Sequence, residues 1–255
     1  MSFISAVSSY SSLSGISGPV PEEVIPNSAC TASIGYGESK YIAERTLEYA
    51  STRYPTSTFG MYRIGQVAGT AKNPRGWNRH EWLPNLIISS RYLGALPETL
   101  GRAGGQFDTE DWVPLDALAG IVTELSGGLK TTSMSSTAGV RVFNVTNPRS
   151  IAWKDLILIV VEELASSRPG DIDLVPFATW LQKLQDSIVS DEGKLDLDQN
   201  PAGKLAEFYQ QLLTTDTSSV GIFSSKRTKE LSRTLSELQP VQAEWLRGWI
   251  GEWLH

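Results

Sequence analysis

The amino-acid sequence predicts an α/β fold, in which a parallel sheet with crossover helices is followed by a mostly helical C-terminal part. Two observations support this prediction. Along the first two thirds of the chain, apolar segments typical of strands alternate with helical segments, in the order strand, helix, strand, helix, helix, strand, helix. From about residue 172 onward, the pattern is mostly helical. Strands that are separated by helices pair in parallel, because each helix carries the chain back across the sheet.

The N-terminal quarter of the chain supplies two strands and a helix. Residues 2–7 form a short apolar strand pattern, which a loop rich in Ser, Gly and Pro follows. A helix is expected over 36–54, because apolar residues recur at helical spacing and Pro55 ends the pattern. A second strand, 58–62, runs into the Gly-flanked segment 63–69, and such a turn commonly lets a ligand approach the backbone.

The middle of the chain adds helices and one strand. Pro114 and Asp116 suit the first turn of a helix, because proline needs no hydrogen-bond partner there and aspartate complements the positive helix end. Ser150 is a good N-cap for the helix that follows the strand. The expected elements are helices over 77–92, 114–125 and 151–165, a loop over 96–105 and a strand over 140–146.

The C-terminal part contains four helical segments, at 177–186, 201–213, 224–238 and 241–254. The change of pattern near residue 172 predicts two domains. Residues 1–170 are expected to form an α/β core with an insert at 71–105, and residues 171–255 are expected to form a helical lobe.

Composition and charge exclude several classes of protein. Hydrophobic residues make up 40% of the chain and charged residues 20%, which is ordinary for a globular protein. The longest apolar run is too short to span a bilayer and the N-terminus lacks a signal-peptide pattern, so a cytoplasmic protein without a membrane partner is expected. A net charge of -6 argues against a nucleic-acid partner. One Cys and two His leave no plausible zinc cluster, so no metal is expected.

The segment Tyr36, Gly37, Glu38, Ser39, Lys40 opens the first predicted helix. Four-residue spacing places the Tyr36 phenol and the Lys40 ammonium on one helix face. An ammonium beside a phenol stabilises the phenolate, so such a pair can exchange a proton with a substrate oxygen. The spacing alone is a weak signal, and its neighbours in the sequence give it specificity.

The order of several short motifs resembles the C-terminal portion of a thioester reductase domain of the extended short-chain dehydrogenase/reductase superfamily. Such domains end fungal nonribosomal peptide synthetase-like proteins and adenylate-forming carboxylic acid reductases. Each motif is weak by itself, and their shared order across the chain is specific. The matching stretches are residues 3–5, 36–40, 62–69, 111–116, 143–148, 200–205 and 245–253.

The resemblance implies a reaction and roles for named residues. Members reduce an acyl thioester carried on the phosphopantetheine arm of a carrier protein, with NADPH as the hydride donor, and release an aldehyde or an alcohol. Tyr36 is then the proton donor, and Lys40 holds the nicotinamide ribose and tunes Tyr36. The residues implied to lie along the nicotinamide are Ile64, Gly65, Gln66 and Val67.

Two departures from the family pattern concern the catalytic hydroxyl and the phosphate-binding turn. Where the family has a second hydroxyl residue on the strand before the Tyr-Lys helix, this chain has Ser5 followed by Ala6. Ser8 lies two residues on, on the same side of an extended strand, and is the candidate for the third catalytic residue.

The Gly-rich turn that binds the cofactor pyrophosphate is not encoded in the 255 residues. On the family layout the first strands are missing as well. The fold expected from the resemblance is therefore an incomplete Rossmann-type parallel sheet with a helical C-terminal substrate lobe, to which the insert 71–105 contributes.

Three functional hypotheses follow. The first is an NADPH-dependent thioester reductase, present here as a fragment. The second is a noncatalytic interaction module that keeps the surface facing the carrier protein, which the missing turn and Ala6 favour. The third is a sugar epimerase or dehydratase of the same superfamily, which shares the Tyr-Lys segment but not the C-terminal pattern.

Overall fold

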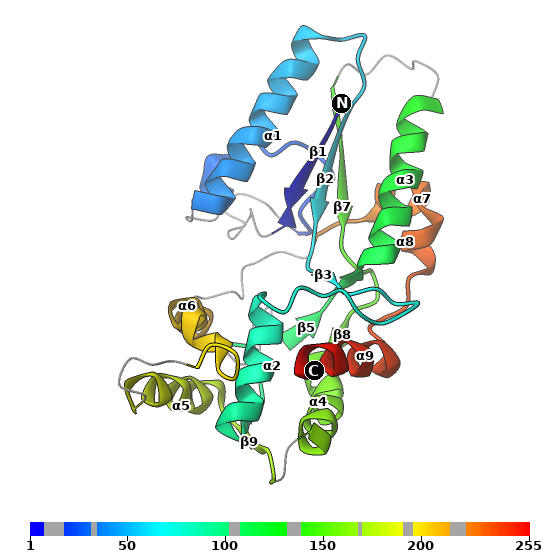
Figure 1. Ribbon diagram of the computed structural model, residues 1–255. Helices are drawn as coiled ribbons and strands as arrows, with labels where there is room; N and C mark the ends of the chain where they lie inside the picture. The colour runs from blue at the N-terminus through cyan, green and yellow to red at the C-terminus, as the bar shows by residue number, and fades with distance from the viewer. Residues whose placement is uncertain are drawn as a thin grey trace. The chain divides into compact units, whose positions relative to one another are not determined.

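The computed structural model describes residues 1–7, 18–31, 35–101, 108–131, 139–167, 170–190, 196–214 and 223–255 (Figure 1). The chain divides into two compact units made of interleaved segments. The first unit comprises Met1–Ala68, Asp111–Arg149 and Ser219–Pro240, and the second comprises Gly69–Glu110, Ser150–Ser218 and Val241–His255.

A three-stranded parallel sheet forms the centre of the first unit. Its strands are β1 (Ser2–Ala6), β2 (Phe59–Ile64) and β7 (Val140–Val145), in the order β1-β2-β7. The central strand, β2, is buried along its whole length, as expected for a strand with a helix on each face. The predicted α/β class with parallel strands is confirmed.

Helices α1 (Gly35–Arg53) and α3 (Leu115–Thr131) lie on opposite sides of this sheet (Figure 1). Alternation along β2 decides which side chains each helix meets, because successive residues of a strand point to opposite faces. One face packs Phe59 and Met61 against Leu47 of α1, and the other packs Tyr62 into a cluster with α3. Gly60 leaves room for α3, since a Cβ there would lie 2.7 Å from Leu129 Cδ1.

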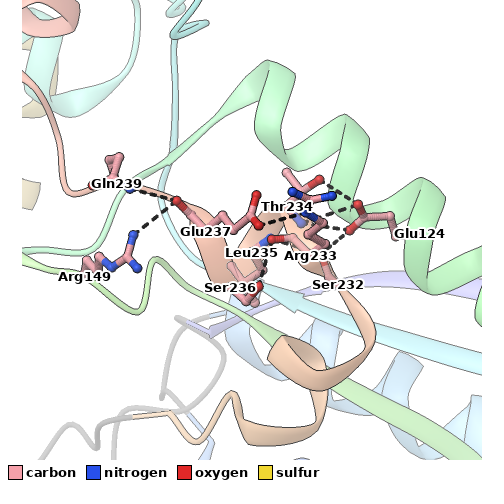
Figure 2. A network of polar contacts seen from close by, with 9 residues as sticks. All are labelled: Glu124, Arg149, Ser232, Arg233, Thr234, Leu235, Ser236, Glu237 and Gln239. Carbon is pink, nitrogen blue, oxygen red and sulfur yellow. Dashed lines mark hydrogen bonds and ion pairs between the residues drawn. The ribbon is translucent and has the colours of Figure 1, made fainter.

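Smaller elements complete the first unit. A two-residue parallel pair joins β3 (Val67–Ala68) to β6 (Val113–Pro114), directly after β2. The helix predicted over 224–238 is two helices, α7 (Lys226–Leu231) and α8 (Arg233–Glu237). Ser232 separates them, because its side chain caps α8 by accepting a hydrogen bond from the Leu235 amide, as Figure 2 shows.

The second unit is mainly helical. Its helices pack around buried aromatic side chains, among them Trp180, whose Nε1 donates to Ser90 Oγ at 2.9 Å, and Tyr209, whose hydroxyl donates to the Trp82 carbonyl at 2.6 Å. Its helices are α2 (Trp82–Leu93), α4 (Trp153–Ser167), α5 (Phe177–Ser190), α6 (Ala206–Thr214), α9 (Ala243–Leu254) and a 3₁₀ helix (Pro201–Leu205), and its strand pairs are β4 (Ala95–Pro97) with β9 (Asp173–Val175) and β5 (Thr109–Glu110) with β8 (Ile151–Ala152).

One predicted helix begins later than expected. The helix predicted over 77–92 starts at Trp82. Trp77 lies outside it and packs edge-on against Trp249 and Trp253 of α9. Pro84 falls in the first turn of α2, where backbone amides have no intrahelical partner, so it removes no helical hydrogen bond.

The two units differ from the predicted division at residue 170. α4 belongs to the second unit, where Arg247 of α9 pairs with Glu162 and Glu163, each at 2.6 Å. Residues 223–240 belong to the first unit. The predicted boundary followed local composition, whereas these assignments follow contacts between segments far apart in the chain. Within the described part of the chain, no helix has the length and apolarity that crossing a bilayer requires.

Candidate functional site

The first turn of α1 presents Tyr36 at the protein surface. The turn is fastened locally, because the Ser39 hydroxyl donates to the Tyr36 carbonyl at 2.7 Å. The Tyr36 side chain is 53% exposed. A phenol in this position is accessible to a substrate, as a proton donor must be.

Lys40 lies one helical turn after Tyr36 and approaches both Tyr36 and β1. Its Nζ donates to the Ile4 carbonyl at 3.1 Å. The same atom lies 5.5 Å from the centre of the Tyr36 ring and 5.4 Å from the centre of the Phe3 ring, within the range of cation–π contact. The structure therefore brings together the two residues that the four-residue spacing paired.

The turn after β2 is held by backbone hydrogen bonds on two sides. The Gly65 amide donates to the Val145 carbonyl at 2.9 Å, and the Val113 amide donates to the Gln66 carbonyl at 2.9 Å. Gly65 is closely packed, since a Cβ there would lie 3.2 Å from Thr146 Cγ2. Ile64 precedes the turn and is in register with Ala6, so the turn begins at the carboxyl ends of β1 and β2.

This edge of the sheet is where α/β proteins bind ligands. Both β1 and β2 point their carboxyl ends toward it, and crevices outside the carboxyl ends of parallel strands are the usual ligand sites of open α/β sheets. The turn residues proposed along the nicotinamide, Ile64, Gly65, Gln66 and Val67, follow this edge.

The end of β1 holds the third catalytic position of the family, where this chain has Ser5 and Ala6. Ala6 ends the strand and carries no hydroxyl. Ser5 is buried, and its hydroxyl donates to Glu44 Oε1 at 2.5 Å in the interior of the first unit. Ser8, the sequence-based candidate, lies outside the described residues.

Two buried residues near Lys40 were not identified from the sequence. Glu44 and Arg63 form a fully buried ion pair, with Arg63 Nη2 2.8 Å from Glu44 Oε2. The position of Glu44, four residues after Lys40, was the available signal, because it puts both side chains on one face of α1. Nothing local marked Arg63 as the partner.

The residues present fit the nicotinamide end of a dinucleotide. They offer an accessible phenol, an adjacent ammonium that can donate to ribose hydroxyls, and a fixed backbone turn at the carboxyl edge of the sheet. The phosphate-binding end has no counterpart in the sequence, because the 255 residues contain no Gly-rich turn of that type.

Comparison with known families gives a match over part of the chain. Residues 8–122 match the NAD-binding family described as Male sterility protein. The family indicates a nicotinamide dinucleotide as the cofactor.

Two curated relatives are reductases. A carboxylic acid reductase of Neurospora crassa is 33% identical over 239 residues, which cover 92% of this chain and 21% of the relative. The adenylate-forming reductase Nps11 of Serpula lacrymans is 28% identical over 266 residues, which cover 98% of this chain and 22% of the relative. The chain thus spans about a fifth of the length of these relatives.

A solved structure shares the fold. The terminal R domain from the myxalamid PKS-NRPS biosynthetic pathway superposes with a TM-score of 0.68 at 19% identity, over 100% of this chain and 57% of that one. Residues 8–122 thus match the NAD-binding family described as Male sterility protein, and the chain is similar in sequence to a carboxylic acid reductase and an adenylate-forming reductase and shares the Rossmann-like fold of a terminal R domain.

Proposed function

We propose that the chain carries the proton-donor part of an NADPH-dependent reductase, which acts in the cytoplasm on an acyl thioester held by a phosphopantetheinyl carrier protein. One observation carries the proposal. The Lys40 ammonium lies 5.5 Å from the centre of the half-exposed Tyr36 ring and is held at 3.1 Å by the Ile4 carbonyl. The reductase relatives support the class of reaction.

The chemistry assigned to the chain is a proton transfer. NADPH, when bound, supplies the hydride that adds to the thioester carbonyl carbon. Tyr36 donates its phenolic proton to the carbonyl oxygen, and a hemithioacetal forms. Lys40 stabilises the phenolate that remains on Tyr36. Loss of the pantetheine thiol from the hemithioacetal then gives an aldehyde, and a second reduction gives an alcohol.

Cofactor binding by the 255-residue chain tests the proposal directly. The fluorescence of NADPH and of NADH is titrated with the protein. Tight binding of NADPH that weakens without the 2′-phosphate supports the proposal, and absence of binding to either cofactor contradicts it for this chain.

A pair of tyrosine variants tests the role of Tyr36. Tyr36→Phe is expected to lower the reduction of an acyl-pantetheine thioester by about 10²–10⁴-fold, the range for loss of a general acid, with cofactor affinity almost unchanged. Tyr49→Phe is the matched control, because Tyr49 lies on the same helix and is 67% exposed. Undiminished turnover in Tyr36→Phe would overturn the assigned role.

A noncatalytic interaction module is the second candidate, and the described residues of β1 favour it. Ala6 replaces the expected hydroxyl, and the neighbouring Ser5 hydroxyl is bonded to Glu44. Loss of an oxyanion donor typically lowers kcat by about 10²–10³-fold. A chain that binds a phosphopantetheinyl carrier protein but neither cofactor would support this second function.

A further inference from the structure

Three residues on one face of α1 connect the surface to the interior of the first unit. Tyr36, Lys40 and Glu44 are spaced by four residues, so their side chains lie above one another along the helix. Their exposure falls along this row, because Tyr36 is 53% exposed and Glu44 is 1% exposed. The row therefore joins the proposed proton donor to a charge in the core.

Lys40 and Glu44, the two less exposed residues of the row, bond to consecutive residues of β1. Lys40 Nζ donates to the Ile4 carbonyl at 3.1 Å, and Ser5 Oγ donates to Glu44 Oε1 at 2.5 Å. One turn of helix advances about 5.4 Å, so the two contacts are separated by one turn on α1 and by one residue on β1. Two such points define both the rotation and the axial position of α1 against the strand.

Arg63 fixes Glu44 from the neighbouring strand. Its Nη2 donates to Glu44 Oε2 at 2.8 Å and its Nε donates to Oε1 at 3.1 Å, a two-pronged contact with a defined orientation. Its Nη1 also donates to the Pro21 carbonyl at 3.3 Å. Arg63 is completely buried and in register with Ser5, so three buried side chains of α1, β1 and β2 form one cluster.

The energetics favour a geometric role for this cluster over a stabilising one. Desolvation of two buried charges offsets much of their attraction, and apolar replacements of such pairs are often neutral or stabilising. An arginine–carboxylate contact does, however, set distance and angle more narrowly than apolar packing does. Misplacement of reacting groups by about 1 Å can lower a rate by about 10²-fold.

We propose that Glu44, Arg63 and Ser5 are positioning residues that hold α1 in the register at which Lys40 reaches the Ile4 carbonyl and the Phe3 ring of β1. The inference rests on the proposed function for its catalytic consequence only. The position of Lys40 can be measured without turnover.

The first experiment reads that position by NMR on the 255-residue chain with ¹³C-labelled lysine. Because Lys40 Nζ lies close to the Phe3 and Tyr36 rings, its ε-methylene signal should be ring-current shifted and show cross-peaks to both rings. Glu44→Gln and Ser5→Ala are expected to lose the cross-peaks to Phe3, which lies on β1, and to keep those to Tyr36, which lies on the same helix as Lys40. Unchanged cross-peaks to Phe3 in both variants would overturn the proposal.

Glu48→Gln is the matched control. Glu48 lies one turn further along α1 and pairs at 2.5 Å with Arg45, but this pair is on the surface. Its replacement is expected to leave the Lys40 signal in place. Ser5→Ala removes only one hydroxyl and leaves the ion pair, so it keeps the test decisive if Glu44→Gln fails to fold. A shifted Lys40 signal in Glu48→Gln as well as in Glu44→Gln would also contradict the proposal.

The second experiment separates this inference from the proposed function. Where the wild type turns over, Glu44→Gln is expected to lower kcat by about 10²-fold and to raise the KM for NADPH as well, because the displaced Lys40 also leaves the position proposed for contact with the nicotinamide ribose. A wild type without cofactor binding would contradict the proposed function and leave the NMR result to decide the inference. An active wild type with an undiminished kcat in Glu44→Gln would contradict the inference alone.

Discussion

The carboxylate of Glu124 on α3 accepts hydrogen bonds from both the hydroxyl and the backbone amide of Thr234, at 2.8 and 3.2 Å (Figure 2). The Ser232 hydroxyl donates to the same carboxylate at 2.5 Å. Glu124 thus ties the first turn of α8 to α3. Burial disfavours its charged form, but the hydrogen bonds from Ser232 and Thr234 outweigh that effect, so the pKa of Glu124 lies below its ordinary value.

Glu124→Gln is expected to lower the free energy of unfolding near pH 7 by about 1–2 kcal/mol, because hydrogen bonds to a charged acceptor are lost. A lowered folded-state pKa contributes stability above the unfolded value near 4.5, and this stability is lost as the pH falls through the lower folded value. The difference between variant and wild type should therefore shrink below pH 4.5. Urea unfolding at pH 7 and pH 3.5 measures it, and Glu237→Gln, at an exposed surface pair with Arg233, is the control.

The pKa of Asp111 is shifted in the opposite direction to that of Glu124. Burial raises its pKa to about 6, so the folded protein holds its proton more tightly than the unfolded chain does. Its contribution to stability is present below the unfolded value near 3.8 and is lost as the pH rises through about 6. Asp111→Asn should therefore be more stable than the wild type at pH 8, with a gain that disappears near pH 4. If Asp111→Asn and the wild type had the same unfolding midpoint at pH 8 as well as at pH 4, the pKa shift would be contradicted.

Two glycines on α9 should respond oppositely to alanine. A Cβ at Gly248 would lie 2.4 Å from Pro74 Cβ and 2.9 Å from the Pro74 carbonyl oxygen, whereas a Cβ at Gly251 meets nothing within 4 Å. Gly248→Ala is expected to destabilise the protein by about 1–3 kcal/mol through overpacking. Gly251→Ala is expected to stabilise it by up to about 1 kcal/mol, because alanine favours the helix. Thermal unfolding distinguishes the two variants.

The outer edge of β1 is a further testable feature of the fold. Among the described residues, β1 pairs with β2 only, and Ile4 on it is 46% exposed. An unpaired apolar edge promotes association, and lysine is a common means of preventing it. Sedimentation velocity should show concentration-dependent association that Ile4→Lys reduces. Ile42→Lys, at an exposed site on α1, is the control and should leave association unchanged.

Local sequence patterns were sufficient for the long elements. The strand predicted over 58–62 is β2, which begins one residue later and ends two residues later, and the helix predicted over 36–54 is α1, which is shifted by one residue at each end. The two-residue strands, such as β3 and β6, were missed, because a pair this short has no periodicity to detect. The break at Ser232 was also missed, since its capping bonds interrupt an otherwise helical pattern.

The candidate site was likewise predictable only in part from the sequence. The spacing of Tyr36 and Lys40 along one helix predicted that they share a face, and their contact bears this out. The ion pair of Glu44 with Arg63 joins residues 19 positions apart on different elements. No pattern within either element specifies that contact.

The sequence by itself determined the α/β class, the positions of the long helices and strands, and the common face of Tyr36 and Lys40, because these follow from periodicities of two and 3.6 residues. Only the tertiary structure decided that this face meets Ile4 of β1, and that Arg63 is buried against Glu44. It also decided that residues 223–240 belong with the sheet. Such contacts depend on how distant segments pack and pair in register, which local spacing does not encode.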